Sequence, residues 1–137
     1  MFTGIIEAIG IIKNLEKIQE EWRLTINSLG LELTDVSVGD SIAVNGCCLT
    51  VVARDEQSFA ADVSNESMRC TVLGELGEGA KVNLEKAMLA TSRFGGHIVS
   101  GHVDCVGILV SSQPEGQSLR LVFSAPNELT KYIAAKG

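Results

Sequence analysis

Strict alternation of polar and apolar residues predicts several short β-strands in the first 90 residues of the chain. Residues 21–27 alternate without interruption, which is typical of a strand with one face buried and the other in water. The same alternation occurs at residues 58–63 and 81–85. A further strand is expected in the opening segment, residues 2–14.

A tight hairpin is predicted where Asn45-Gly46 separates two apolar runs, residues 41–44 and residues 47–52. Asn-Gly favours a hairpin because both central positions of the tight turn need a positive φ. The hairpin adds two strands, which brings the number expected in this part of the chain to six.

One short helix is predicted between the last two strands. It covers residues 66–73, Ser64 or Asn65 caps its start, and it ends before Gly74. Six closely spaced strands with one short helix favour an all-β fold. A small closed barrel is expected rather than an open sheet, because closure leaves no unpaired edge.

An internal repeat relates the start of the chain to its end. Residues 3–10 are echoed by residues 100–107, at an offset of 97. Three further matches follow in the same order, with one residue lost and then two gained: Arg23-Leu24 with Arg120-Leu121, Glu32-Leu33-Thr34 with Glu128-Leu129-Thr130, and Gly39 with Gly137. Matching order and strand types indicate a duplicated unit.

The second copy contains about two of the six strands. We therefore expect a first barrel over residues 1–96 and an incomplete second barrel over residues 97–137, with the boundary in the linker-like residues 91–96. Part of a barrel cannot bury its apolar face or pair its edges. The sequence therefore predicts an incomplete chain, or a tail that packs on another chain.

Composition excludes several classes of partner. The net charge is -6 and no basic run occurs, which argues against nucleic acid. No apolar stretch approaches the roughly 20 residues of a membrane span, and the N-terminus does not resemble a signal peptide. Cys47 and Cys48 are adjacent and would point to opposite faces of a strand. A reduced, cytoplasmic protein is expected.

The two histidines are candidates for acid-base chemistry, since imidazole titrates near neutrality. His97 and His102 are five residues apart, so they would not share a face of one strand, and a joint metal site is not expected. Glycines precede both and allow close approach to a ligand. The alternative is a pair of hydrogen-bonded surface histidines.

Cys48 lies just after the predicted turn, at the rim of the barrel, where ligand sites are common. Its thiol could act as a nucleophile if its pKa were lowered, but no cation is adjacent in sequence. The alternative for Cys48, and more so for Cys47, is a small buried apolar side chain. Ser41 begins a strand, where a solvated hydroxyl is the default.

A cluster of polar residues lies where a strand leads into the predicted helix. Hydroxyls, carboxylates and free backbone N–H groups there would suit a polyol, although ordinary helix capping is the alternative. The cluster consists of Asp62, Ser64, Asn65, Glu66 and Ser67. No nucleotide-binding or hydrolase motif occurs, so these residues alone predict no reaction.

Four segments together resemble the riboflavin synthase family of the α-chain type, and the resemblance covers the whole chain. They are Met1-Phe2-Thr3-Gly4-Ile5-Ile6-Glu7, Asn45-Gly46-Cys47-Cys48-Leu49-Thr50-Val51, Gly95-Gly96-His97-Ile98-Val99-Ser100-Gly101-His102-Val103-Asp104 and Lys131-Tyr132-Ile133-Ala134-Ala135-Lys136-Gly137. Lumazine proteins of the same superfamily bind the chromophore without turnover. They are expected to lose the cysteine and histidine pattern, which this sequence keeps.

The resemblance implies two six-stranded Greek-key barrels and a C-terminal helix that assembles a homotrimer. The implied reaction is the dismutation of two 6,7-dimethyl-8-ribityllumazine molecules to riboflavin and 5-amino-6-ribitylaminouracil, without metal or cofactor. For this chain the implied assembly is a homodimer that imitates the pair of barrels. Lumazine synthase is a further candidate partner.

The resemblance also implies roles for particular residues. Ser41 and Cys48 would act as nucleophile or activate water, and His102 would transfer protons. The implied substrate contacts are Gly4, Ile5, Ile6, Cys48, Leu49, Thr50, Asp62, Val63, Ser64, Asn65, Glu66 and Ser67, with Gly101, His102, Val103 and Lys136 assigned to the second barrel's site. Ser41, Glu66 and Ser67 are the residues suited to bind the ribityl hydroxyls.

The second copy has no counterpart of residues 45–51 or 62–67 within this chain. We therefore expect the first barrel to bind lumazine or riboflavin, with weak or no turnover. A non-catalytic lumazine- or flavin-binding protein is the alternative. A ligand-free structural barrel would leave the polar rim and the glycine-flanked histidines unexplained.

Overall fold

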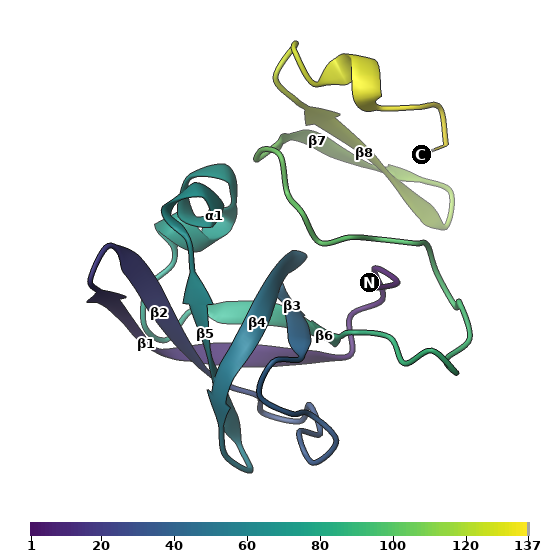
Figure 1. Cartoon of the computed structure of the whole chain (residues 1–137). Helices are drawn as coiled ribbons and strands as arrows, with labels where there is room; N and C mark the ends of the chain where they lie inside the picture. The colour runs from purple at the N-terminus through teal and green to yellow at the C-terminus, as the bar shows by residue number, and fades with distance from the viewer. Residues whose placement is uncertain (137) are drawn as a thin grey trace. The chain divides into compact units, whose positions relative to one another are not determined.

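The computed structural model describes residues 1–136, which divide into two compact units (Figure 1). The first unit is Met1–Val103 and contains the barrel. The second begins at Asp104 and contains a two-stranded sheet. Within the described residues, no helix is both long enough and apolar enough to span a membrane.

Six antiparallel strands close into a barrel in the order β1-β2-β5-β4-β3-β6. Their bounds are β1 (Ala8–Ile18), β2 (Glu21–Asn27), β3 (Ser41–Val44), β4 (Cys47–Arg54), β5 (Ser58–Val63) and β6 (Lys81–Lys86). Because the sheet closes on itself, each of its strands is paired on both sides. The expected six-stranded antiparallel barrel is confirmed.

The alternating pattern positions the core as predicted. Leu24 and Ile26 of β2 are buried, as are Leu49 and Val51 of β4, and the inward side chains of all six strands fill the interior of the barrel. The turn between β3 and β4 is the Asn45-Gly46 hairpin, with φ of +47° and +81°. Both values fall in the left-handed region that favours these residue types.

The opening segment was wrongly predicted as part of the first strand, which begins only at Ala8. Phe2 instead forms an isolated bridge with Val99, and Gly4 has a φ of +81°. The backbone N–H groups of Thr3 and Gly4 donate to the side chain of Glu85 rather than to a strand. The Glu85 carboxylate therefore takes the place of a neighbouring strand as the acceptor for these two N–H groups, and the segment before Ala8 is not part of the sheet.

The predicted helix is split in two. The first part, α1 (Asn65–Cys70), begins after Ser64, whose side chain accepts from the Ser67 N–H as expected for a cap. Thr71 is extended and caps a second piece, the 3-10 helix η1 (Val72–Glu75). Gly74 lies inside this piece, where a Cβ would collide with the Met68 carbonyl, so the prediction that the helix ends before Gly74 was wrong.

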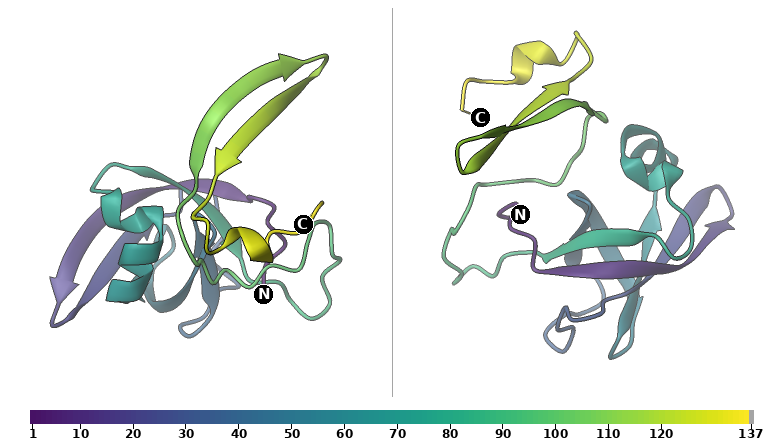
Figure 2. Two further views of the ribbon diagram at one scale, coloured as in Figure 1. Left: turned by 90° about the horizontal axis from the view of Figure 1, so that it is seen from above. Right: turned by 180° about the vertical axis from the view of Figure 1, so that it is seen from behind.

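The second unit repeats the first two strands of the barrel (Figure 2). It contains β7 (Ile108–Glu115), β8 (Ser118–Ser124) and the 3-10 helix η2 (Thr130–Tyr132). At the offset of 97, β8 has the bounds of β2, and the register shift between Ile12 and Asn14 recurs between Leu109 and Ser111.

The shorter offset after β8 also recurs. The Val36 N–H donates to the Leu33 carbonyl, and the Tyr132 N–H donates to the Leu129 carbonyl. The repeat is therefore confirmed as a structural one, and the second sheet fits an incomplete second copy. The proposed match of Gly39 with Gly137 lies outside the described residues.

Candidate functional site

Four of the candidate residues share the outer face of the barrel over β3, β4 and β5. Along β4 the side chains of Cys47, Leu49 and Val51 are buried, whereas Cys48 is half-buried and Thr50 is exposed. These two and the cross-strand neighbours described next form the patch that we call the Cys48 patch: Ser41, Cys48, Thr50 and Asp62.

The strand register brings Ser41 and Asp62 onto this face. Ser41 of β3 pairs directly with Thr50, and directly opposed residues share a face. Val51 pairs with Ala61, and both are buried. Thr50, which precedes Val51, and Asp62, which follows Ala61, therefore both point outward. Ser41 is diagonal to Cys48 in this register, about 7–8 Å away, so their side chains cannot bond directly. A ligand could lie between them.

Residues 97–103 belong to the barrel unit, and Gly101 among them contacts this patch. The Cys48 backbone N–H donates to the Gly101 carbonyl at 2.8 Å, and Val103 packs on the barrel core. Gly101 has a φ of +78°, and a Cβ added there would lie 2.8 Å from the Cβ of Cys48. Only glycine allows this approach.

This placement differs from the assignment made from the resemblance, in which Gly101, His102 and Val103 serve the second barrel. In the structure Gly101 and Val103 contact the first barrel, and His102 between them is exposed. Lys136, assigned to the same group, lies in the second unit. The domain boundary expected after residue 96 was placed where the repeated sequence begins, and it stays a prediction. The compact unit that contains the barrel extends further, to Val103.

Hydrogen bonds within the chain already organise the polar cluster at the start of α1. Ser64 and Ser67 bond through their hydroxyls at 3.1 Å, and the Asn65 side chain donates to the Glu20 carbonyl at 2.6 Å. Capping therefore accounts for Ser64, which was the alternative interpretation. A polyol would have to add to these bonds or replace them.

The two carboxylates of the cluster are each paired with an arginine. Arg23 holds Asp62 through two bonds of 2.7 and 2.9 Å, and Arg69 pairs with Glu66. Hydrogen bonding to these guanidinium groups lowers the pKa of both carboxyls below their ordinary values. Both are therefore acceptors at neutral pH, and neither is suited to act as an acid there.

Cys47 behaves as a buried side chain and Cys48 does not. Cys47 is only 4% exposed, and burial raises the pKa of its thiol. We expect iodoacetamide at about pH 8 to alkylate Cys48 faster than Cys47, by about an order of magnitude or more, because the thiolate is the nucleophile. Tandem mass spectrometry of the modified peptide measures both sites. Equal rates would contradict the buried position of Cys47.

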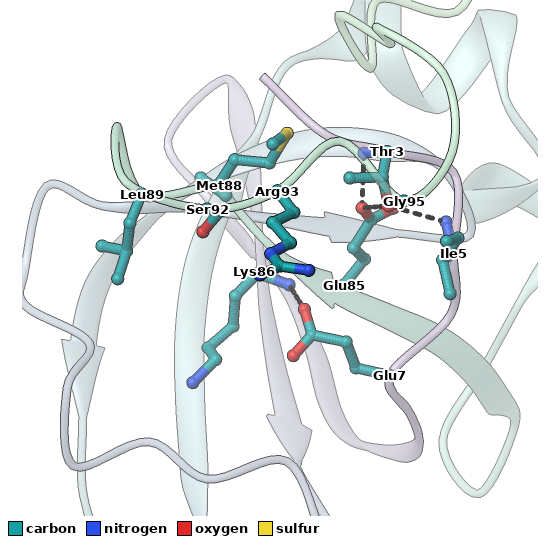
Figure 3. A pocket seen from close by; sticks show the side chains of 11 residues that line it. Thr3, Ile5, Glu7, Glu85, Lys86, Met88, Leu89, Ser92, Arg93 and Gly95 are labelled. Carbon is teal, nitrogen blue, oxygen red and sulfur yellow. Dashed lines mark hydrogen bonds between the residues drawn. The ribbon is translucent and has the colours of Figure 1, made fainter.

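The opening segment borders a cavity of about 340 Å³ next to β6 (Figure 3). The described residues that line this cavity include Glu7, Glu85 and Arg93. Ile5 is the one residue among them that was predicted from the sequence as a substrate contact. Ile5 and Ile6 are about half-exposed. Glu85 could not be singled out from the sequence, because its hydrogen-bond partners are some 80 residues away in the chain.

Metal ligands do not gather in this structure: within residues 1–136 no group of three or more histidine, cysteine or acidic side chains could hold an ion. His97 and His102 are both exposed. The Cys48 patch offers the hydroxyls of Ser41 and Thr50, the thiol of Cys48 and the carboxylate of Asp62. His102 follows Gly101 in the chain, whose carbonyl accepts from the Cys48 N–H.

These features define a class, a small closed antiparallel barrel whose outer face is covered in part by the start of a second copy. Residues 3–87 match the lumazine binding domain family, and the chain belongs to that family. The chain is 45% identical to the riboflavin synthase of Photobacterium phosphoreum and 44% identical to that of Bacillus subtilis (strain 168). All of this chain is covered, but only 63% of either relative.

Solved structures of LumP are similar to this fold. LumP complexed with riboflavin matches with a TM-score of 0.82 and 31% identity, over 97% of this chain and 72% of that one. LumP complexed with 6,7-dimethyl-8-(1'-D-ribityl) lumazine matches with a TM-score of 0.78 and 30% identity, with similar coverage. The resemblance to the riboflavin synthase family is thus confirmed.

Proposed function

We propose that this chain binds 6,7-dimethyl-8-ribityllumazine and riboflavin at the Cys48 patch, and that it carries the first lumazine site of a riboflavin synthase. The observation that carries the proposal is the close contact between Gly101 and Cys48. The start of the second copy thereby forms a wall beside an outward-facing row of polar groups. Family membership and the ligands named for LumP support the ligand class.

In this proposal the planar ring lies on the outer face of β4, against the side chains of Cys48 and Thr50. Leu49 points into the barrel core, so it would meet the ring through its backbone. The ribityl chain runs toward the start of α1, where Glu66 and Ser67 supply acceptor and donor groups and Ser41 adds a hydroxyl from β3. Two lumazines held face to face would need mainly correct positioning, since bringing reactants together can supply several kcal/mol. Ser41 and Cys48 would serve as nucleophile or activate water, and His102 would transfer protons.

A complete reaction site requires a second lumazine on an equivalent surface. The opening segment supports this geometry: Gly4 and Gly101 have φ values of +81° and +78°, and the Thr3 and Ser100 hydroxyls accept from the N–H two residues on. Gly4, Ile5 and Ile6 would cover a second barrel as residues 101–103 cover the first. In this chain a homodimer would supply that barrel, and in the full-length family a homotrimer would.

Turnover by these 137 residues is proposed to be weak or absent, because the second copy has no counterpart of residues 45–51 or 62–67 among them. A non-catalytic lumazine- or flavin-binding protein is the second candidate, favoured by the likeness to LumP. The cytoplasm is the proposed compartment, and lumazine synthase is a possible partner.

The test is a fluorescence titration of the folded chain with riboflavin and with 6,7-dimethyl-8-ribityllumazine. We expect saturable binding that Cys48→Leu weakens by about tenfold or more, because a larger side chain blocks the patch. The control is Ala53→Leu, at the far end of the same strand. Absence of any fluorescence change with folded protein would refute binding, and rapid formation of riboflavin would refute weak turnover.

A further inference from the structure

Glu85 is the one charged side chain that is buried among residues 1–136, with 5% of it exposed. It lies on β6 and points at the opening segment (Figure 3). Its Oε1 accepts from the Thr3 N–H at 2.6 Å and from the Thr3 hydroxyl at 2.7 Å, and its Oε2 accepts from the Gly4 N–H at 3.1 Å. Buried carboxylates are costly unless they are bonded in this way.

The segment that Glu85 holds is bonded in turn to the chain around residue 99. Phe2 and Val99 exchange two backbone hydrogen bonds, of 2.8 and 3.0 Å. The His97 N–H donates to the Thr3 carbonyl at 2.9 Å. Two residues beyond Val99, Gly101 accepts from the Cys48 N–H. Hydrogen bonds and short stretches of backbone therefore connect Glu85 to the Cys48 patch without a break.

We propose that Glu85 is a positioning residue for the Cys48 patch: by fixing Thr3 and Gly4 it fixes residues 97–101, and through them the wall that Gly101 forms beside Cys48. Glu85 acts through the backbone and touches no ligand. The effect on ligand binding rests on the proposed function, whereas the effect of Glu85 on the backbone beside Cys48 can be measured without ligand.

A carboxylate is required at this position because all three partners are donors. An amide offers one acceptor atom, and its NH₂ group would face the Gly4 N–H. In Glu85→Gln one of the three bonds is therefore replaced by a repulsive contact. Bonds to a charged acceptor are worth more than neutral ones, and their loss here releases the opening segment.

Two readouts separate positioning from general stability. The first is the affinity for riboflavin, which we expect Glu85→Gln to weaken by about tenfold. The second is hydrogen exchange of the Cys48 amide, measured by NMR without ligand, which should become faster by a similar factor. Amides between β2 and β5 should exchange as in the unaltered chain.

Asp55 provides a matched control. Its carboxylate accepts from the N–H groups of Gln57 and Ser58 and from the Ser58 hydroxyl. Glu85 likewise accepts from two backbone N–H groups and one hydroxyl. It follows the far end of β4, away from Cys48. Asp55→Asn should lower stability and leave both the affinity and the exchange of the Cys48 amide unchanged.

If Glu85→Gln does not fold, Thr3→Val keeps both backbone bonds to Glu85 and removes the two bonds of the Thr3 hydroxyl, one to Glu85 and one from the Ile5 N–H. It should give a smaller loss, about threefold, in the same two readouts. Unchanged affinity and unchanged Cys48 exchange in a folded Glu85 or Thr3 variant would overturn the proposal. An equal effect of Asp55→Asn would overturn it too. If the unaltered chain binds no flavin, the proposed function fails, while the exchange of the Cys48 amide still decides the role of Glu85.

Discussion

Gly101→Ala is expected both to destabilise the barrel unit and to weaken flavin binding. The residue has a φ of +78°, which costs a residue with a Cβ about 1–2 kcal/mol. The added Cβ would also lie 2.8 Å from the Cys48 Cβ and 3.0 Å from its backbone nitrogen, and such overpacking costs about 1–3 kcal/mol more. Urea unfolding should show a loss of about 2–5 kcal/mol, and the titration a loss of affinity of at least about tenfold.

Gly79→Ala is the matched control for backbone strain. Gly79 has a φ of +83°, but nothing lies within 4 Å of the position its Cβ would take. The Gly79→Ala variant should therefore lose only about 1–2 kcal/mol of unfolding free energy and keep its affinity for riboflavin. The difference between the two variants measures the close approach to Cys48. Equal losses in both would show that residues 97–103 leave the barrel in solution.

Local patterns predicted the barrel because each strand carries its own signal. The alternation at Glu21–Asn27 and Ser58–Val63 gave both ends of these strands correctly. The Asn45-Gly46 turn needs only two residues to be recognised. The repeat was predictable for a similar reason, since equal offsets recur wherever the two copies share a strand or a bulge.

The parts that sequence reasoning missed depend on contacts between distant residues. Glu85 looks like the polar end of an ordinary strand, and only the fold brings Thr3 to its carboxylate. Gly101 was assigned to a second barrel, because nothing in the sequence indicates that it bonds to Cys48. The roles proposed for Ser41, Cys48 and His102 stay predictions.

Truncation of Phe2 tests the same region through its core. The ring is 1% exposed and contacts the position that a Cβ on Gly101 would take. Phe2→Ala should cost about 3–5 kcal/mol of unfolding free energy, because a buried ring is replaced by a cavity. It should also weaken riboflavin binding by about tenfold or more, since Phe2 anchors Val99 by two backbone bonds and the loss of the ring frees that pair.

Phe59→Ala separates these two effects. Phe59 is equally buried, and it pairs with Arg54 at the end of β4 opposite to Cys48. Its truncation should cost a similar amount of stability, while the folded fraction should keep its affinity. Titrations are compared where both variants are fully folded by circular dichroism, and Phe2→Leu and Phe59→Leu serve if the alanine variants unfold. Similar affinities for the two variants would mean that the opening segment stabilises the barrel without shaping the site.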